Sequence, residues 1–174
     1  MRLFREQGYD RTTVEQIAEA AEVSPSTFFR YFPTKEDVVL YDALDPLLMA
    51  AFRRQPAELS ALRAMQAAMH EVWSQLSPQQ IEEQAERGRL AFVVPTLRER
   101  YVVEMVRTAS LMVGLAAERA GPETTEFEIR VATGAVLGGI LAAMLPLYDG
   151  SAADVDMIGL VDDAVAVLER GVTL

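Results

Sequence analysis

The 174-residue sequence contains no cysteine and only one lysine, one histidine and one tryptophan. The absence of cysteine excludes a disulfide scaffold, a thiol nucleophile and any thiolate metal site, and we expect neither a metal nor a cofactor. Basic residues are also scarce, because 16 Lys and Arg stand against 26 Asp and Glu, a formal net charge of −10. On composition alone, a pI near 4.6 argues against a nucleic-acid partner.

The acidity is unevenly distributed along the chain. Residues 1–54 carry 7 basic and 9 acidic residues, a net charge of −2, whereas residues 55–174 carry 9 and 17, a net charge of −8. The lone lysine, Lys35, falls in the first part. Between residues 23 and 35 the only charged side chains are Arg30 and Lys35, so this short segment can approach phosphate despite the acidic whole.

The apolar residues, 51% of the chain, recur at helical spacings of three and four. Because runs of alternating apolar residues bounded by hairpin turns are missing, we predict an all-α fold. The pattern divides into a three-helix unit over residues 1–45 and a larger bundle of five or six helices over residues 46–174. Charged residues at positions 1–6 argue against a signal peptide, which predicts a cytoplasmic protein.

One uncharged stretch, residues 131–148, raises the question of a membrane span. Its 18 residues approach the roughly 20 that a transmembrane helix needs. Its three glycines and Pro146 favour instead a buried helix whose small residues let a second helix approach closely. We therefore predict no membrane partner.

Helix ends are marked by prolines, glycines and capping residues. Ser24 and Pro25 form an N-cap followed by proline at the first helical position. Asp45-Pro46 is either a kink within one helix or the start of a new one. The other predicted boundaries are Gly8, Pro33, Ser77-Pro78, Pro95, Gly121-Pro122 and Asp149-Gly150-Ser151, with a last helix over residues 154–170.

The most informative segment is residues 12–35. It predicts two short helices joined by a tight connection, the second with polar and aromatic groups facing outward. A helix-turn-helix presents its recognition helix to the major groove of DNA in this way. The first helix of the pair begins with a capping box formed either by Thr12 with Glu15 or by Thr13 with Gln16.

This segment closely resembles the DNA-binding module of the TetR family of bacterial transcriptional regulators. The resemblance implies a homodimer that binds a palindromic operator in double-stranded DNA, with a larger helical domain that holds a small effector. It also implies dimer formation by the last two helices, here around Val131–Leu147 and Met157–Leu168. The matching residues are Gly8-Tyr9, Thr12-Thr13-Val14, Ile17-Ala18, Ala21, Val23-Ser24, Thr27-Phe28, Tyr31-Phe32 and Lys35-Glu36.

Carried over by position, the resemblance assigns two groups of DNA-binding residues. Arginine can bind guanine through two hydrogen bonds, and hydroxyls can donate to phosphate oxygens. For Phe29 and Tyr31, burial in the core of the module is the alternative. The implied base-reading residues are Pro25, Ser26, Phe29 and Arg30. The implied phosphate-binding residues are Thr12, Thr13, Thr27, Tyr31 and Lys35.

The second part of the chain, residues 46–174, contains less specific signals of function. Aromatic and methionine side chains are typical of apolar ligand sites, although a packed helix core explains them equally well. Arginines on both sides of Pro95 could converge on a phosphate or carboxylate, and solvated surface arginines are the alternative. The candidate effector-binding residues are Met69, His70, Trp73, Arg89, Phe92, Arg98, Tyr101 and Met105.

The sequence of residues 28–40, followed by Asp45-Pro46-Leu47-Leu48, resembles that of mycofactocin-type regulators, which respond to fatty acyl-CoA. This resemblance implies that arginines face the CoA phosphates and that a methionine-rich interior holds the acyl chain.

Two functions remain open at this stage. The first is a ligand-responsive repressor that a lipophilic or acyl-CoA-like effector releases from its operator. The second follows from the first helix, which is shorter than the family pattern, where it normally begins well before the position of Leu3-Phe4. Either the true start lies upstream of Met1, or the protein is a dimeric helical sensor that has lost DNA binding with a shortened first helix. An enzyme is disfavoured, because His70-Glu71 lacks a second histidine one turn on and no G-x-S-x-G or glycine-rich phosphate loop is present.

Overall fold

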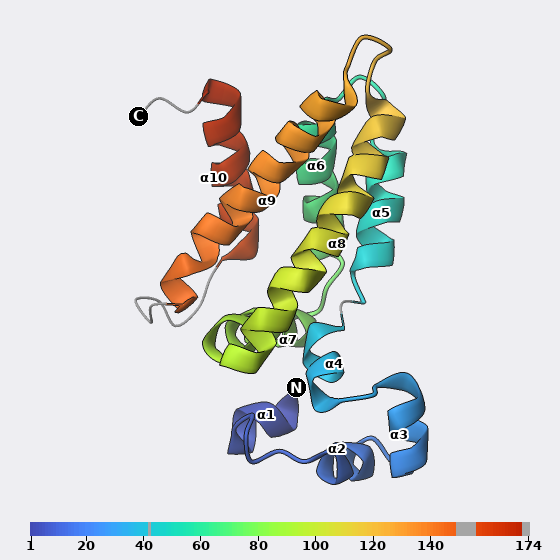
Figure 1. Ribbon diagram of the computed structural model, residues 1–174, viewed down its shortest axis with the longest axis vertical. Helices are drawn as coiled ribbons and strands as arrows, with labels where there is room; N and C mark the ends of the chain where they lie inside the picture. Colours follow the sequence, from blue (N-terminus) through green and yellow to red (C-terminus); the bar gives the residue numbers. More distant parts are fainter. Residues whose placement is uncertain (42, 149–155, 172–174) are drawn as a thin grey trace.

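The computed structural model describes residues 1–41, 43–148 and 156–171. Within these ranges the chain forms helices and turns without a strand, which confirms the predicted all-α fold. Figure 1 shows a small module of short helices at one end of the molecule and a bundle of longer helices above it. The predicted break at Asp149-Gly150-Ser151 and the predicted helix start at residue 154 lie outside the described residues.

The small module contains three short helices, α1 (Arg2–Gln7), α2 (Val14–Ala20) and α3 (Pro25–Tyr31). α2 begins at the N-cap Thr13, whose hydroxyl and backbone exchange hydrogen bonds with Gln16, so the second of the two possible capping boxes forms. The connection to α3 is tight because Glu22 adopts a left-handed φ of 55°. Ser24 then caps α3 by accepting from the Thr27 N–H, as the sequence predicts.

The sequence left open whether one or two helices follow α3 before residue 54, and the structure has two. α4 spans Lys35–Leu40 and α5 spans Asp45–Arg54, with Pro46 in the first turn of α5. Asp45-Pro46 therefore starts a new helix. The missing N–H of proline costs nothing at that position, whereas it would break a hydrogen bond inside a continuous helix.

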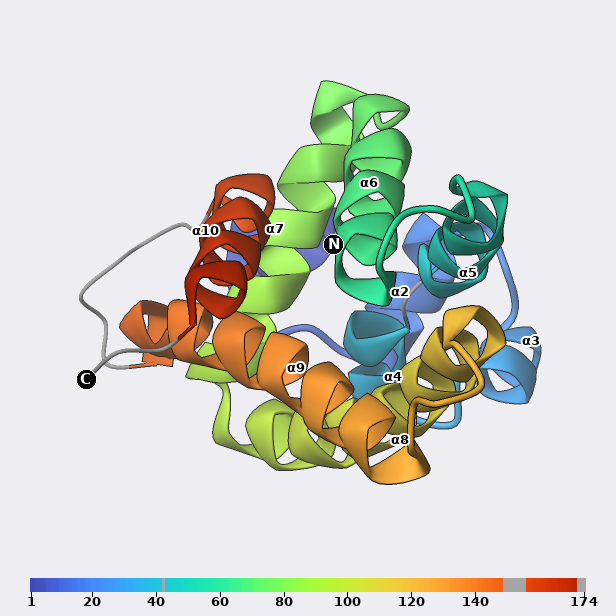
Figure 2. The ribbon, with the colours of Figure 1, turned by 90° about the horizontal axis from the view of Figure 1, so that it is seen from above.

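The bundle is completed by α6 (Ala61–Ser74), α7 (Pro78–Val93), α8 (Pro95–Arg119), α9 (Glu126–Tyr148) and α10 (Met157–Arg170). Seen from above, α9 lies between α8 and α10 (Figure 2). α9 begins at Glu126, beyond the predicted boundary at Gly121-Pro122, because Thr125 and Glu128 form a capping box that fixes its start. α7 and α8 begin at Pro78 and Pro95, as predicted.

The module and the bundle share a hydrophobic cluster. Phe4 and Tyr9 from the module, Val39 from α4, and Leu90 and Leu97 from α7 and α8 are all buried together. Apolar burial of this kind is worth about 25 cal/mol for each Å² removed from water. The module is therefore seated on the corner between α7 and α8, so a movement of that corner reaches α1 and α4 directly.

Candidate DNA-binding surface and effector cavity

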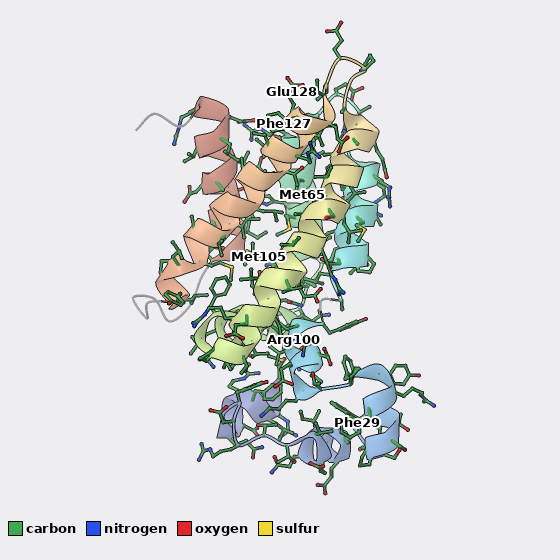
Figure 3. All side chains as sticks on the ribbon, viewed as in Figure 1. Phe29, Met65, Arg100, Met105, Phe127 and Glu128 are labelled. Carbon is green, nitrogen blue, oxygen red and sulfur yellow. The ribbon has the colours of Figure 1, made fainter. Side chains whose placement is uncertain are left out.

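The outward face of α3 carries the residues predicted to read bases. Pro25, Ser26, Phe29 and Arg30 are exposed, whereas Phe28, on the opposite side of α3, is buried. Phe29 is 48% exposed and meets Phe28 edge-on, so the alternative that it is buried in the core does not describe its position. Figure 3 shows Phe29 on α3, at the end of the molecule distant from the bundle. These four side chains therefore form one exposed face of α3.

Hydroxyl groups surround the two ends of α3. At its start, the Ser24 hydroxyl lies 2.9 Å from that of Ser26 and 3.0 Å from that of Thr27. At its end, Tyr31 is 68% exposed, with the Arg30 guanidinium 5.1 Å from the centre of its ring. Such groups can donate to phosphate oxygens on either side of a groove.

The two threonines at the start of α2 differ in their surroundings. Thr12 is 1% exposed, and its hydroxyl donates to the Gly8 carbonyl at 2.8 Å and accepts from the Gln7 side chain at 3.2 Å. The hydroxyl of Thr12 is thus turned into the module and away from DNA, contrary to the expectation from sequence. Thr13 is exposed at the helix start, which leaves it as the phosphate-binding candidate of this pair.

Lys35 is held inside the module as well. Its ammonium donates to the backbone carbonyls of Tyr9 at 3.0 Å and Thr12 at 3.3 Å, and it lies 4.2 Å from the centre of the Tyr9 ring. These contacts tie α4 to the loop between α1 and α2. The ammonium therefore has a structural task besides the phosphate contact expected from sequence.

We expect Lys35→Ala to lower the melting temperature of the protein without DNA, because two hydrogen bonds from a charged donor and a cation–π contact are lost. The expected cost is about 2 kcal/mol, measured by thermal unfolding at fixed protein concentration. If the variant melts like the parent and only binds every DNA more weakly, Lys35 acts on phosphate alone.

A second contact fixes α4 to the module. The Tyr9 hydroxyl donates to a Glu36 carboxylate oxygen at 2.6 Å. Burial, followed by the contact with Glu36, raises the pKa of Tyr9 far above its ordinary value. Burial alone would raise the pKa of Glu36, but the hydrogen bond from Tyr9 and others lower it. Glu36 therefore stays ionised, and the contact persists, throughout the neutral range.

A large cavity of about 1690 Å³ lies within the bundle. Its volume exceeds the roughly 300–1,000 Å³ of ordinary small-molecule sites, so it has room for a long ligand. Figure 3 shows Met65 of α6 and Met105 of α8 in the middle part of the bundle, and both line the cavity. Four of the predicted effector-binding residues line it, namely Met69, Trp73, Tyr101 and Met105. Among the lining residues that the sequence did not single out as effector-binding are Met65, Met112, Ile140 and Met144.

The other four predicted effector-binding residues are not among the described residues that line the cavity. His70 bonds to Asp162 of α10 at 2.7 Å, and Arg89 forms two hydrogen bonds with Glu86. Phe92 is buried beside Tyr101. The guanidinium of Arg98 stacks on Tyr148 and donates to the backbone. These four side chains thus have other partners, on the same helix or on another one, and sequence spacing alone does not reveal them.

The arginines on both sides of Pro95 do not form one cluster. Arg87 and Arg100 line the cavity, and both also bind α4, whereas Arg89 and Arg98 have the separate partners given above. A spacing of two residues on a helix turns side chains about 200° apart, so neighbours of this kind face opposite ways. This helical periodicity was the signal in the sequence that could have distinguished Arg87 and Arg100, which line the cavity, from Arg89 and Arg98, which do not.

A module with an exposed recognition helix, seated on a helical bundle with a large and mostly apolar cavity, is the architecture of a DNA-binding transcriptional regulator. Residues 1–41 match the bacterial regulatory proteins of the tetR family, and residues 59–173 match the MftR C-terminal domain. The chain therefore belongs to the TetR family, with a C-terminal domain of the MftR type. The members of this family are transcriptional regulators and not enzymes.

Individual relatives agree with this assignment. The chain is 39% identical over 122 residues to the HTH-type transcriptional regulator TcmR of Streptomyces glaucescens, covering 67% of this chain and 53% of TcmR. It is 35% identical over 74 residues to HbdR of Aromatoleum sp. (strain CIB), covering 42% of this chain and 32% of HbdR. The chain thus spans about half the length of TcmR and a third of HbdR.

A solved structure has a similar fold. It is that of Thermus thermophilus FadR, a TetR-family transcriptional repressor, in complex with lauroyl-CoA. The TM-score is 0.61 at 21% sequence identity, covering 100% of this chain and 91% of FadR. At this identity the likeness concerns the fold.

Proposed function

We propose that this protein is a repressor that binds a palindromic operator as a homodimer and is released by a fatty acyl-CoA or a similar lipophilic effector. Residues 1–45 then bind DNA, and residues 46–174 hold the effector and form the dimer. The observation that carries the proposal is the methionine-rich cavity in the bundle to which the DNA-binding module, with its exposed α3, is attached. The MftR-type domain and the lauroyl-CoA complex of FadR support an acyl-CoA as the effector.

The volume and lining of the cavity suit an acyl chain. Methionine side chains come from α6, α8, α9 and α10, and their flexible thioethers adapt to chains of different length. The indole of Trp73, the single tryptophan of the sequence, also lines the cavity. Its fluorescence therefore reports directly on an occupant.

The outer face of α9 supports the dimer. α9 is long and apolar enough to cross a membrane by length and composition, yet only 18% of its apolar window is buried within the chain. Exposed residues recur along it at alternating spacings of four and three, the pattern of a helix that packs against another helix. We propose that a second copy, and not lipid, covers this face in a cytoplasmic protein. The exposed stripe consists of Phe127, Val131, Gly134, Gly138, Leu141, Leu145 and Tyr148.

The glycines of α9 argue for the same interface. A Cβ atom at Gly139 would lie 3.2 Å from the Cβ of Ala164, so the packing of α10 within the chain accounts for this glycine. Gly134 and Gly138 have nothing within 4 Å of such a Cβ atom. Glycine in a helix interior costs about 1 kcal/mol relative to alanine. A partner helix that approaches closely would explain both residues.

DNA binding and its release test the proposal. The protein is titrated into labelled DNA from the region upstream of its own gene, followed by fluorescence anisotropy, and the complex is then titrated with dodecanoyl-CoA. We expect specific binding, quenching of Trp73 by dodecanoyl-CoA, and a decrease in operator affinity of about 5–150-fold. Binding of dodecanoyl-CoA without binding of any DNA would instead support the helical sensor that has lost DNA binding.

Arg30→Ala is expected to reduce sequence preference more than overall affinity. A lost pair of hydrogen bonds to guanine costs about 1–3 kcal/mol at one base pair, while non-specific binding is carried by phosphate contacts. Competition between operator and unrelated DNA at one salt concentration measures the ratio of the two affinities, which is the sequence preference. A uniform loss on both DNAs would show that Arg30 binds phosphate.

A further inference from the structure

Two arginines of the bundle hold the two ends of α4. Arg100, from the start of α8, donates to the Thr34 hydroxyl at 2.9 Å and to a carboxylate oxygen of Asp37. Arg87, from α7, donates to the carbonyls of Val38 at 2.6 Å and Val39 and Tyr41 at 3.0 Å. Figure 3 shows Arg100 where the bundle meets α4. We call Arg87, Arg100 and their contacts with α4 the α4 latch.

α4 depends on such contacts because it is short. A helix of six residues is unstable by itself, since its end groups outnumber its internal hydrogen bonds. Thr34 and Asp37 form its capping box, and Arg100 bonds to both. Burial would raise the pKa of Asp37, but hydrogen bonds from Thr34 and Arg100 lower it below its ordinary value. The carboxylate is therefore charged at neutral pH and attracts Arg100.

The latch is also part of the cavity wall. Both arginines line the cavity, which continues past Asp37, Val39 and Tyr41 of the α4 segment to Tyr31 at the end of α3. A ligand at this end reaches the guanidinium groups without contact with the base-reading residues on the outward face of α3, which do not line the cavity.

Other charged residues line the cavity too. Asp45 and Glu104 lie at the same end as the latch, and Glu104 pairs with Arg107. At the far end, Arg119 donates to the carbonyls of Phe52, Gln55, Pro56 and Leu59, which occupy both of its terminal nitrogens.

We infer that Arg87 and Arg100 bind the anionic head group of an amphipathic effector, and that this head group displaces α4 from the latch. The inference rests on the proposed function, since it assumes an effector with an apolar chain in this cavity. A carboxylate or phosphate oxygen competes with Asp37 for the planar fork of Arg100 and with the α4 carbonyls for Arg87. Loss of the latch lets α4 move, and α4 shifts the module to which Lys35 and Glu36 bind it.

The test compares three probes with one chain length. Dodecanoate carries a carboxylate, dodecanoyl-CoA carries phosphates, and 1-dodecanol carries no charge. Binding is measured by the fluorescence of Trp73, and the state of α4 by hydrogen exchange of its amides. We expect both anions to accelerate exchange over residues 36–41, whereas 1-dodecanol binds without this effect. If only dodecanoyl-CoA does so, phosphate is the head group; if only dodecanoate does, it is the carboxylate.

Variants separate competition from a merely structural role. Arg100→Gln is expected to weaken dodecanoate binding at least about tenfold, as for a lost charge-assisted hydrogen bond, with 1-dodecanol unaffected. Asp37→Asn is expected to strengthen dodecanoate binding several-fold, because the competing carboxylate is gone. Arg53→Gln is the matched control, since it breaks another arginine–carboxylate pair with α8, to Glu118, outside the cavity wall.

Three results would overturn the inference. One is an anion that binds while α4 stays protected. The second is an Arg100→Gln variant that binds dodecanoate as tightly as the parent. The third is an Asp37→Asn variant that binds it more weakly. If none of the three probes alters Trp73 fluorescence, both the proposed lipophilic effector and the inference about the latch are wrong. If 1-dodecanol binds but neither anion changes the hydrogen exchange of α4, only the inference about the latch is wrong.

Discussion

Gly138→Phe is expected to turn the protein into a folded monomer. The substitution leaves the chain intact, because nothing lies within 4 Å of a Cβ atom at this position and phenylalanine is a better helix former than glycine. At the proposed crossing of two α9 helices, however, the ring keeps the backbones apart. We expect the dimer dissociation constant to rise at least about a hundredfold, about 3 kcal/mol, measured by sedimentation velocity. Operator affinity falls with it, since two half-sites require two recognition helices.

Gly114→Phe is the matched control for this experiment. Gly114 lies in the interior of α8, is exposed, and likewise has nothing within 4 Å of an added Cβ atom. We expect this variant to remain dimeric. If Gly114→Phe is a monomer and Gly138→Phe remains a dimer, the dimer interface is formed by α8 and not by α9.

Leu97→Ala is expected to destabilise the protein by about 2–5 kcal/mol, because it opens a cavity in the cluster that joins the module to the bundle. Leu97 is 0% exposed and packs with Phe4, Tyr9, Val39 and Leu90. Against a typical total stability of about 5–15 kcal/mol this loss is large, and it corresponds to a melting temperature lower by roughly 4–20 °C. Thermal unfolding at fixed concentration measures it.

Leu111→Ala serves as the control for Leu97→Ala. It makes the same change in the same helix, at a side chain that is 50% exposed, and is expected to alter stability by less than about 0.5 kcal/mol. Equal losses from the two variants would mean that the cluster around Leu97 does not support the fold.

Local chemistry explains why so much of the helix pattern could be predicted. The starts at Thr13, Ser24 and Ser77 depend on a hydroxyl and an N–H three residues away, and those partners are adjacent in the sequence. Gly8 ends α1 with a φ of 85°, which few other residues adopt. Where two local signals competed, as with Thr12 and Thr13, the sequence left the choice open.

Side-chain partners distant in sequence could not be predicted in this way. Arg98 and Arg100 look alike in the sequence, but Arg98 stacks on Tyr148 of α9 while Arg100 reaches Asp37 of α4. Thr12 matches a phosphate-binding position, and only its burial between α1 and α2 shows that its hydroxyl is occupied. Such outcomes depend on which helices become neighbours, and no spacing within one helix encodes that.

The sequence by itself determined the helical fold, the order of its helices, and the outward face of α3, because caps, breakers and helical periodicity act over a few residues. The tertiary structure decided which side chains line the cavity, which arginines hold α4, and which face of α9 stays uncovered. Those properties arise when helices distant in the chain pack together, and the single lysine illustrates the difference. Its position in the motif is written in the sequence, whereas its hold on the loop before α2 exists only in the folded molecule.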